Sequence, residues 1–433
     1  MQKADVAGRA RVAGQRARGA GQRMAHDATQ RWRERTGRDE IIYLVAPAGH
    51  PNYGDELIVR TWLRYLAQVR PHATVVVDCH SPGQACLYFQ DDHPRVLFVD
   101  TLWQLTIYAD RDLPDDVGVP PWEWVADSAS RLGGAPRLAE GVDLLRRAST
   151  VHLVGGGYLN ALWPGQVSLV TGAAAVARST GARVVATGHG LTPVFLGARG
   201  DAFLTAASAF ELFDVRDAAS LEVLAGVPGA RCTGDDVWLA VPDVAVPCQE
   251  RHAGPLDGVA LCVQADLVGD FRYAGADGVA ALAGFVRDTL DAWEVPGDQV
   301  TVVEGIPGRD YEVPELLGDR LAGATVVPFL DVWRLGMPVG AGRTWLGTRF
   351  HPHLVAAAAG DSGVAIVPKP DYYATKHASL TAAGSKWTVV GGDGEPAVPP
   401  RPTAGGFSAV DRERNVAAKA ALAAELYPRR RLL

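Results

Sequence analysis

The fold is decided by the stretch IIYLVAPAGHPNYGDELIVRTWLRYLAQV, residues 41–69. Its beginning, IIYLVAP, is a short continuous apolar run, as expected of a strand that is buried on both faces of a sheet. A turn containing Gly, Pro and Asn follows, and DELIVRTWLRYLAQV then places its apolar residues at helical spacing. The stretch predicts a parallel strand, a turn and a helix, which together form the first unit of an α/β fold.

The same alternation of strand and helix patterns continues along the chain. Strand-like runs include TVVVDCH, TVHLVGGG and ARVVATGHG, and the helix pattern SLVTGAAAVARSTG lies between the last two. A stretch rich in Pro and Val at residues 241–255 interrupts the series, which restarts at GVALCVQAD. The sequence therefore predicts two doubly wound, Rossmann-like domains, at residues 41–245 and 256–390, that face a cleft. Residues 391–433 are predicted to be a loop and a final helix that returns towards the first domain.

Residues 1–40 are predicted to form a basic tail. Residues 1–38 hold ten Lys and Arg against three Asp and Glu, a net charge of +7 within a chain of net charge −7. Two interpretations stay open: a solvated, partly helical tail, which we favour, and an arm that touches an anionic membrane surface. The tail lacks the apolar run of a secretory signal, and the chain lacks an apolar run of about 18 residues, so we expect neither a signal nor a transmembrane helix.

The overall composition narrows the class of protein. The negative net charge argues against a nucleic-acid binder. The five cysteines have no CxxC spacing and indicate neither a zinc site nor a disulfide framework. We therefore expect a reduced, cytoplasmic protein, and the high content of Ala, Gly, Arg and Val suggests a bacterial source.

Polar residues gather at the predicted carboxyl ends of the strands, where α/β sheets bind their ligands. Arg216 and Arg349 each follow such a strand, and His351 is predicted at the N-cap of the next helix, because Pro352 suits its first turn. An arginine fork, an imidazole and a helix N-terminus together form an anion pocket. The alternative for Arg216 is a pair with Asp217 that fixes the turn, and His353 is predicted to pack in the interior.

Other polar residues at strand ends have both a structural and a chemical interpretation. His189 lies between two glycines and is predicted to be exposed at its turn, where it can titrate near neutral pH. Asp55, Glu56 and Asp235 follow turns and can cap helices. In a cleft lined by arginines, these acids can instead hold hydroxyl groups or act as acid or base.

The ordered set of motifs resembles the polysaccharide pyruvyl transferase family. GHPNYGDELI is similar to the N-terminal GNxGDE signature of that family, and GGG, GHGLTP, VRDAASLEVL and TGDDVWLA follow in the family's order. GTRFHPHLVAAAAGDSGVAI resembles its C-terminal RxH block, and DYYATKHASL resembles the segment that follows. The resemblance extends from about residue 41 to residue 380.

The resemblance implies an enzyme with a GT-B-like fold. Such enzymes move the enolpyruvyl group of phosphoenolpyruvate onto two hydroxyls of a cell-surface glycan or lipid-linked sugar, as a ketal, without a cofactor or a metal. Arg216, Arg349 and His351 match residues implicated in holding phosphoenolpyruvate, and His189 matches the GQG-like turn. The predicted catalytic residues are His351 as general acid, Asp55 as base on the acceptor side, and His189. The predicted substrate-binding residues are Arg216, Arg349, Asn52, Gly54, Glu56, Gly156, Gly157 and Asp235.

Two rival functions share this fold. A glycosyltransferase that uses a nucleotide-sugar needs an acid for the ribose, and Glu304, Glu312 and Glu315 are available in the second half. A non-catalytic family member is the other rival. The retention of Arg216, Arg349 and His351 together argues against it.

Overall fold

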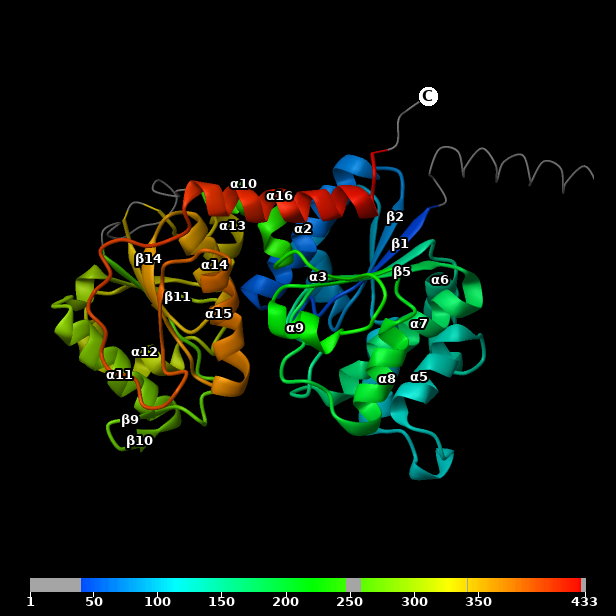
Figure 1. The fold of residues 1–433 in the computed structure, drawn as a ribbon, viewed down its shortest axis with the longest axis horizontal. Coiled ribbons are helices and arrows are strands. Elements are labelled where there is room, and N and C mark those ends of the chain that lie inside the picture. The colour runs from blue at the N-terminus through cyan, green and yellow to red at the C-terminus, as the bar shows by residue number, and fades with distance from the viewer. Residues whose placement is uncertain (1–39, 247–257, 341, 430–433) are drawn as a thin grey trace, which may run out of the picture.

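Two parallel β-sheets lie side by side in the computed structural model, which describes residues 40–246, 258–340 and 342–429 (Figure 1). The first sheet has the strand order β3-β2-β1-β4-β5-β6-β7. Its strands are β1 Ile41–Val45, β2 Thr74–Asp78, β3 Val96–Val99, β4 Thr150–Leu153, β5 Arg183–His189, β6 Leu212–Val215 and β7 Ala230–Cys232. All the pairings are parallel, and the central pair β1 and β4 places Val45 opposite Leu153.

The second sheet has the strand order β12-β11-β8-β13-β14-β15, and a two-stranded hairpin accompanies it. Its strands are β8 Val259–Cys262, β11 Val300–Val303, β12 Thr325–Val327, β13 Thr344–Gly347, β14 Ser362–Ile366 and β15 Thr388–Val390, and the hairpin strands are β9 Arg272–Tyr273 and β10 Ala276–Asp277. Both sheets therefore reverse their strand order at one point, between β1 and β4 and between β8 and β13. The predicted α/β class with two doubly wound sheets is confirmed.

Helices connect the strands and cover the sheets. The helices beside the first sheet are α2 Tyr53–Val69, α3 Pro82–Phe89, α4 Thr101–Arg111, α5 Pro121–Ser130, α6 Ala139–Arg146, α7 Val167–Thr180, α8 Gly197–Ala207, α9 Ala218–Val223 and α10 Val241–Val244. The later helices are α11 Gly278–Ala292, α12 Glu312–Leu317, α13 Phe329–Leu335, α14 Phe350–Ala358, α15 Thr375–Ala382 and α16 Ala409–Leu426. Short turns of helix are η1 Asp115–Val117, η2 Pro136–Leu138, η3 Pro164–Gln166, η4 Asp236–Leu239, η5 Gly297–Gln299, η6 Gly318–Leu321 and η7 Pro370–Ala374.

The opening stretch folds as its pattern predicts. Residues 42–45 of β1 are fully buried, as expected of a strand with helices on both faces of its sheet. Asn52 caps α2, because its side chain accepts a hydrogen bond from the backbone N–H of Gly54. Residues 81–149, for which no element was predicted, form β3, the helices α3, α4, α5 and α6, and the short helices η1 and η2.

The two sheets are joined by helix α2 and the helices of the second half. The backbone N–H of Tyr53 donates to the carbonyl oxygen of Gly305 at 2.9 Å. The guanidinium of Arg60 lies 3.3 Å above the ring of Trp333 and donates to its carbonyl oxygen. One apolar core runs through these contacts and contains residues of α2, α13, α14 and α16. The beginning of α2 is thereby held against the second sheet.

The final helix, α16, spans both halves along one edge of the molecule (Figure 1). Its Lys419 is fully buried and donates to Asp214 at 2.7 Å and to Asp236 at 3.1 Å. Asp236 also accepts from Thr187 and from the indole of Trp62. A charge that is buried so deeply is stable only when it is paired and hydrogen-bonded, so this network fixes α16 to the first sheet. The domain limits given above stay a prediction, and the tail up to residue 39 lies outside the described residues.

Within the described residues, none of the helices is long and apolar enough to cross a membrane.

Candidate functional site

A cavity of about 380 Å³ lies where the carboxyl ends of the two sheets meet, and we call it the central cavity. Residues that follow β1, β4 and β6 form one side of it, and residues that follow β8, β11, β13 and β14 form the other. This is the edge at which open α/β sheets bind ligands, beside the points where their strand order reverses. Of the predicted site residues, those in its wall are Asn52, Gly54, Asp55, Gly157, Arg216, Arg349 and His351.

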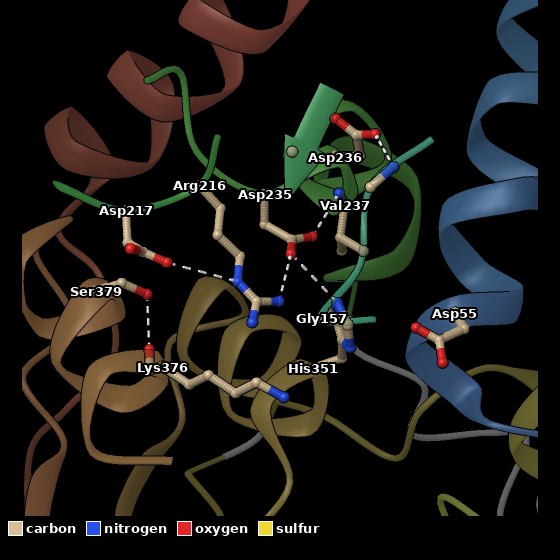
Figure 2. Close-up of polar contacts among 12 residues, drawn as sticks. Asp55, Gly157, Arg216, Asp217, Asp235, Asp236, Val237, His351, Lys376 and Ser379 are labelled. Carbon is tan, nitrogen blue, oxygen red and sulfur yellow. Dashed lines mark hydrogen bonds and ion pairs between the residues drawn. The ribbon is translucent and has the colours of Figure 1, made fainter. Parts of the chain in front are cut away.

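Arg216 reaches the central cavity from the turn after β6, and Figure 2 shows its guanidinium beside Asp235 and above Lys376. The side chain is almost fully buried, 3.5 Å from Asp235 Oδ2 and 3.8 Å from Asp217 Oδ2. Its guanidinium carbon lies 4.5 Å from the centre of the Phe350 ring. Nε of Arg216 forms no hydrogen bond within the described residues. The proposed pair with Asp217 is therefore a loose one, and Asp217 instead caps α9 by accepting from the N–H of Ser220.

Lys376 is a cation of the central cavity that the sequence analysis did not single out. It lies at the beginning of α15, buried, with Nζ 3.5 Å from the centre of the Tyr372 ring. Burial lowers the pKa of Lys376 well below its usual value, and the nearby charge of Arg216 lowers it further. The signal that was available is the segment DYYATKHASL, which places a lysine after two tyrosines and a strand.

Gly157 explains how the two cations come so close to the backbone. A Cβ at Gly157 would lie 3.0 Å from Nζ of Lys376 and 3.2 Å from Nη2 of Arg216. The carbonyl oxygen of Gly157 accepts from the hydroxyl of Tyr372, which follows β14. The glycine turn after β4 thus seats side chains from both sheets, because it has no side chain of its own.

His351 lies in the first turn of α14, in the wall of the central cavity, and its imidazole points towards Asp235 (Figure 2). Nε2 of His351 is 3.4 Å from Oδ2 of Asp235 and forms no hydrogen bond within the described residues. The structure corrects the predicted N-cap: Arg349 is the capping residue, and His351 is the second residue of the helix. A Cβ at Gly54 would lie 1.6 Å from Nδ1 of His351, so only glycine allows the start of α2 to approach this imidazole.

Asp235 both caps a helix and contacts residues of the site, the two roles that were predicted for it as alternatives. Its Oδ1 accepts from the N–H of Val237 at 2.9 Å and caps the short helix η4. Its Oδ2 faces Arg216 and His351. Burial alone would raise the pKa of Asp235, but the charges of His351 and Arg216 hold it well below its usual range. Asp235 is therefore an anion that orients Arg216 and His351 from behind the cavity wall.

Arg349 lies in the cavity wall, but its charge is already paired. Its guanidinium donates to Asp266 Oδ1 at 2.8 Å and, through Nε, to Asp310 Oδ1 at 3.1 Å. Asp310 is fully buried and also accepts from the N–H groups of Gly305 and Ile306. A buried arginine needs such partners, because an unpaired charge there is costly. Arg349 is thus not the free cation that was predicted, because its charge is neutralised by Asp266 and Asp310. It links the loops that follow β8 and β11.

The predicted exposure of His189 is wrong. Its side chain is 0% exposed, packed against the rings of Tyr158 and Phe213, with Nε2 3.1 Å from the carbonyl oxygen of Leu153. Burial lowers its pKa to about 4. The ring is not part of the cavity wall, because β5 extends through His189 and turns its side chain into the core of the first sheet.

Two further predicted contacts are placed behind the central cavity. Glu56 turns back from α2 and accepts from the N–H of Gly49 at 3.0 Å. Burial raises its pKa to about 8. Gly156 is not part of the cavity wall, and its φ of 146° shows that it serves the backbone conformation of the glycine turn.

Asp55 does lie in the wall of the central cavity, where it accepts a hydrogen bond from the side-chain amide of Asn52 at 2.8 Å. Burial raises the pKa of Asp55.

His353 packs in the interior, as predicted. Its ring stacks on Trp387 at 4.3 Å between centroids and lies within hydrogen-bond distance of His377 and Ser385. Two residues that are neighbours on α14 therefore point to different surroundings, His351 to the central cavity and His353 to the core.

Two facing sheets with a ligand cavity between their carboxyl ends define the class of protein. The UDP-GlcNAc 2-epimerase of Methanocaldococcus jannaschii has a similar fold, with a TM-score of 0.50 at 9% identity over 88% of this chain and 91% of that chain. This fold is GT-B-like. Weaker likenesses are a UDP-GlcNAc 2-epimerase from Neisseria meningitidis (TM-score 0.48, 10% identity, 90% and 92% covered) and UGT2 of Phytolacca americana (TM-score 0.42, 13% identity, 90% and 90% covered).

The particular family follows from the sequence. The sequence model of the polysaccharide pyruvyl transferase family matches residues 52–274, a little over half of the chain. The chain therefore belongs to the polysaccharide pyruvyl transferase family, and the resemblance in the motifs is confirmed. Membership makes the protein a transferase of polysaccharide biosynthesis. No curated protein is similar enough in sequence to match it.

Proposed function

We propose that this enzyme transfers the pyruvyl group of phosphoenolpyruvate onto two hydroxyls of a sugar in a cell-surface glycan, as a ketal. The observation that carries the proposal is the convergence of Arg216, Lys376 and His351 on one small cavity. Phosphoenolpyruvate is a compact anion with a carboxylate and a phosphate, so it needs fixed cations at short range. The N-terminus of α14 adds backbone N–H groups on the same side.

Within this proposal, Arg216 and Lys376 bind the anionic groups of the donor. Arg216 offers a planar fork of donors, and Lys376 offers a point charge. Arg349 shapes the wall rather than supplying free charge, because Asp266 and Asp310 neutralise it. The proposal needs no metal ion, since these side chains meet the charge of the donor.

His351 acts as general acid and Asp55 as general base in the proposed reaction. His351 delivers a proton to C3 of phosphoenolpyruvate, and C2 becomes electrophilic. A sugar hydroxyl bonds to C2 as its proton passes to Asp55. The bond between C2 and the phosphate oxygen then breaks, and the second hydroxyl closes the ketal. One hydroxyl proton balances the proton placed on C3, the other leaves with the phosphate, and the products are the ketal and inorganic phosphate.

A nucleotide-sugar donor is less well supported by the second half. Glu304 was available as a ribose-binding acid, but its two oxygens accept from the N–H groups of Gly308 and Phe329. Glu312 and Glu315 lie in the first turn of α12, outside the wall of the central cavity. None of these three glutamates therefore offers a free carboxylate to the central cavity for a ribose.

The deciding experiment compares two donors with the purified full chain. We expect inorganic phosphate to be released from phosphoenolpyruvate in the presence of a glycan acceptor, with no nucleotide added. Isothermal titration should show phosphoenolpyruvate binding that Arg216→Gln weakens. Sugar transfer from a nucleotide-sugar without phosphoenolpyruvate would instead identify a glycosyltransferase, and absence of any phosphoenolpyruvate binding would indicate a non-catalytic member.

A cytoplasmic location, with the basic tail on the inner face of a membrane, belongs to the same proposal. This location would place the enzyme beside a lipid-linked acceptor.

A further inference from the structure

A buried cluster of charges lies behind the wall of the central cavity, and its centre is Lys419 of α16. Lys419 is 0% exposed and is not part of the cavity wall. It pairs with Asp214 of β6 and with Asp236 of η4, and we call these three residues the lysine cluster. Burial alone would lower the pKa of Lys419, but the charges of the two acids hold it above its usual value. The buried lysine is therefore a cation in the folded protein.

Asp236 ties the glycine turn after β4 to the end of β5. Its Oδ2 accepts from the N–H of Gly155 at 3.0 Å and from the hydroxyl of Thr187 at 2.7 Å. A Cβ at Gly155 would lie 2.9 Å from Oδ2, and a Cβ at Gly188 would lie 2.6 Å from Oδ1. The two glycines thus leave room for this carboxylate between the strand ends. The turn that begins at Gly155 continues to Gly157, which lies against two cations of the cavity.

Asp214 ties the end of β5 to the turn after β7. Its Oδ2 accepts from the N–H of Gly188 at 3.0 Å, and its Oδ1 accepts from the N–H of Thr233 at 2.8 Å. Asp214 lies two residues before Arg216 in the chain, and Thr233 lies two residues before Asp235. The two acids of the lysine cluster therefore hold the backbone of four neighbouring strand ends, those of β4, β5, β6 and β7.

The adjacent acids Asp235 and Asp236 connect the lysine cluster to the site. Figure 2 shows their carboxylates pointing in different directions. Asp236 contacts Lys419, whereas Asp235 lies 3.5 Å from Arg216 and 3.4 Å from His351. Removing one partner of a buried ion pair leaves a charge that nothing compensates. Without the lysine, the two acids of the cluster would repel each other, and the strand ends that they hold would shift.

We infer that Lys419 is a positioning residue of the donor site, because its charge holds together the two acids that set the positions of Arg216 and Asp235. Lys419 belongs to the final helix, which spans both halves of the molecule (Figure 1). A segment that follows the second sheet in the chain thus completes the donor side of the first. The inference rests on the proposed function for the identity of the donor, whereas the effect of Lys419 on side-chain positions does not.

The test compares two variants of Lys419 in the full chain. Lys419→Met removes the charge and keeps an unbranched side chain. The double variant Lys419→Met/Asp214→Asn also removes one acid, so that the cluster keeps the net charge of the wild type and folding is less affected. The matched control is Leu422→Ala, which removes a buried apolar side chain from the same helix and leaves the three charges in place. Melting temperature, titration calorimetry with phosphoenolpyruvate, steady-state kinetics and crystal structures are obtained for all four proteins, the wild type included.

We expect the Kd for phosphoenolpyruvate to rise about tenfold in both Lys419 variants, the effect of misplacing one charge-assisted hydrogen bond. Their kcat/KM for phosphoenolpyruvate should fall about 10²-fold, because a displacement of about 1 Å at the reacting groups has that cost. The acceptor KM should stay near that of the wild type. Leu422→Ala should lower the melting temperature and keep the wild-type Kd, as a merely structural role of Lys419 would also do. In the crystal structures, Arg216 and Asp235 should be displaced in the Lys419 variants alone.

Wild-type affinity for phosphoenolpyruvate in a folded Lys419 variant would overturn the inference, and so would unmoved Arg216 and Asp235 side chains in its crystal structure. If the wild type neither binds nor consumes phosphoenolpyruvate, the proposed function fails. The crystal structures then decide the inference. Displacement of Arg216 and Asp235 in the Lys419 variants, but not in Leu422→Ala, upholds it.

Discussion

His351 and Asp235 face each other at 3.4 Å, although His351 follows a strand of the second sheet and Asp235 follows the last strand of the first. The pair exists only where the two sheets meet. Arg216 approaches the same carboxylate oxygen at 3.5 Å, so one acid aligns a cation and an imidazole at the edge of the central cavity. In this arrangement the acid group of the proposed reaction and the donor-binding arginine share one support.

His351→Ala tests the general acid. Loss of a general acid lowers turnover by about 10²–10⁴-fold, and we expect a decrease of that size in kcat for phosphate release at saturating phosphoenolpyruvate. The control is His72→Ala, which removes an exposed histidine at the turn after α2. Both melting temperatures are measured as well, so that loss of folding is recognised. Turnover near that of the wild type in a folded His351→Ala protein would remove His351 from this role.

Gly54→Ala tests the close contact between the two halves. A Cβ at Gly54 would overlap the imidazole of His351, whereas a Cβ at Gly83, near the beginning of α3, meets nothing within 4 Å. Displacing a catalytic group by about 1 Å can cost about 10²-fold in rate, so we expect Gly54→Ala to lower kcat/KM strongly. Gly83→Ala should keep full activity, with a melting temperature equal to or above that of the wild type, because alanine favours helix. Equal activities in the two variants would contradict the contact.

Lys376→Met tests the lowered pKa of Lys376 together with anion binding. Above its lowered pKa the free lysine is neutral, and an anionic donor favours its charged form, so binding takes up a proton. Below that pKa the lysine already carries its proton, and the uptake disappears. Titration calorimetry in buffers of different ionisation enthalpy, repeated over a pH series, measures this uptake. We expect it in the wild type and in the exposed control Lys386→Met, and not in Lys376→Met, which should also bind phosphoenolpyruvate more weakly. Identical proton uptake in all three proteins would exclude Lys376 as the group involved.

Glu56→Gln tests the raised pKa of the buried carboxylate of Glu56. The pKa of Glu56 is raised to about 8 in the folded protein, above the value of about 4.3 in an unfolded chain. Between these values the folded state binds the extra proton, so the contribution of Glu56 to stability is greatest below about pH 4.3 and declines as the pH rises to about 8. Urea unfolding at several pH values should therefore show a steeper loss of stability with pH in the wild type than in Glu56→Gln. Parallel curves for the two proteins would mean that burial of Glu56 does not shift its pKa.

The fold class, and the edge of the fold at which ligands bind, could be predicted from the sequence alone. Apolar runs alternate with helical patterns from residue 41 onward, and this local pattern predicts parallel strands that are connected by crossover helices. Because parallel strands present their carboxyl ends on one edge, Asp55 and Arg216 are expected on the ligand-binding edge of the first sheet and His351 on that of the second. The resemblance to the family supplied the order of these motifs, and the match of residues 52–274 confirmed the family.

Which of these side chains face the central cavity depends on how the chain packs in three dimensions. His189 and His351 both follow strands, yet the extension of β5 buries the first, and the turn before α14 presents the second. The partners of Arg349 come from the loops after two other strands, so the sequence around Arg349 does not predict that its charge is neutralised. Lys376 reaches the cavity because Gly157 leaves room for it from the opposite sheet. Helix α4 and the short helix η3, which pack against each other, are elements that no sequence pattern predicted. The alternation of strands and helices is thus a property of local pattern, whereas pairing, burial and charge at the site are set by contacts between segments that lie far apart in the chain.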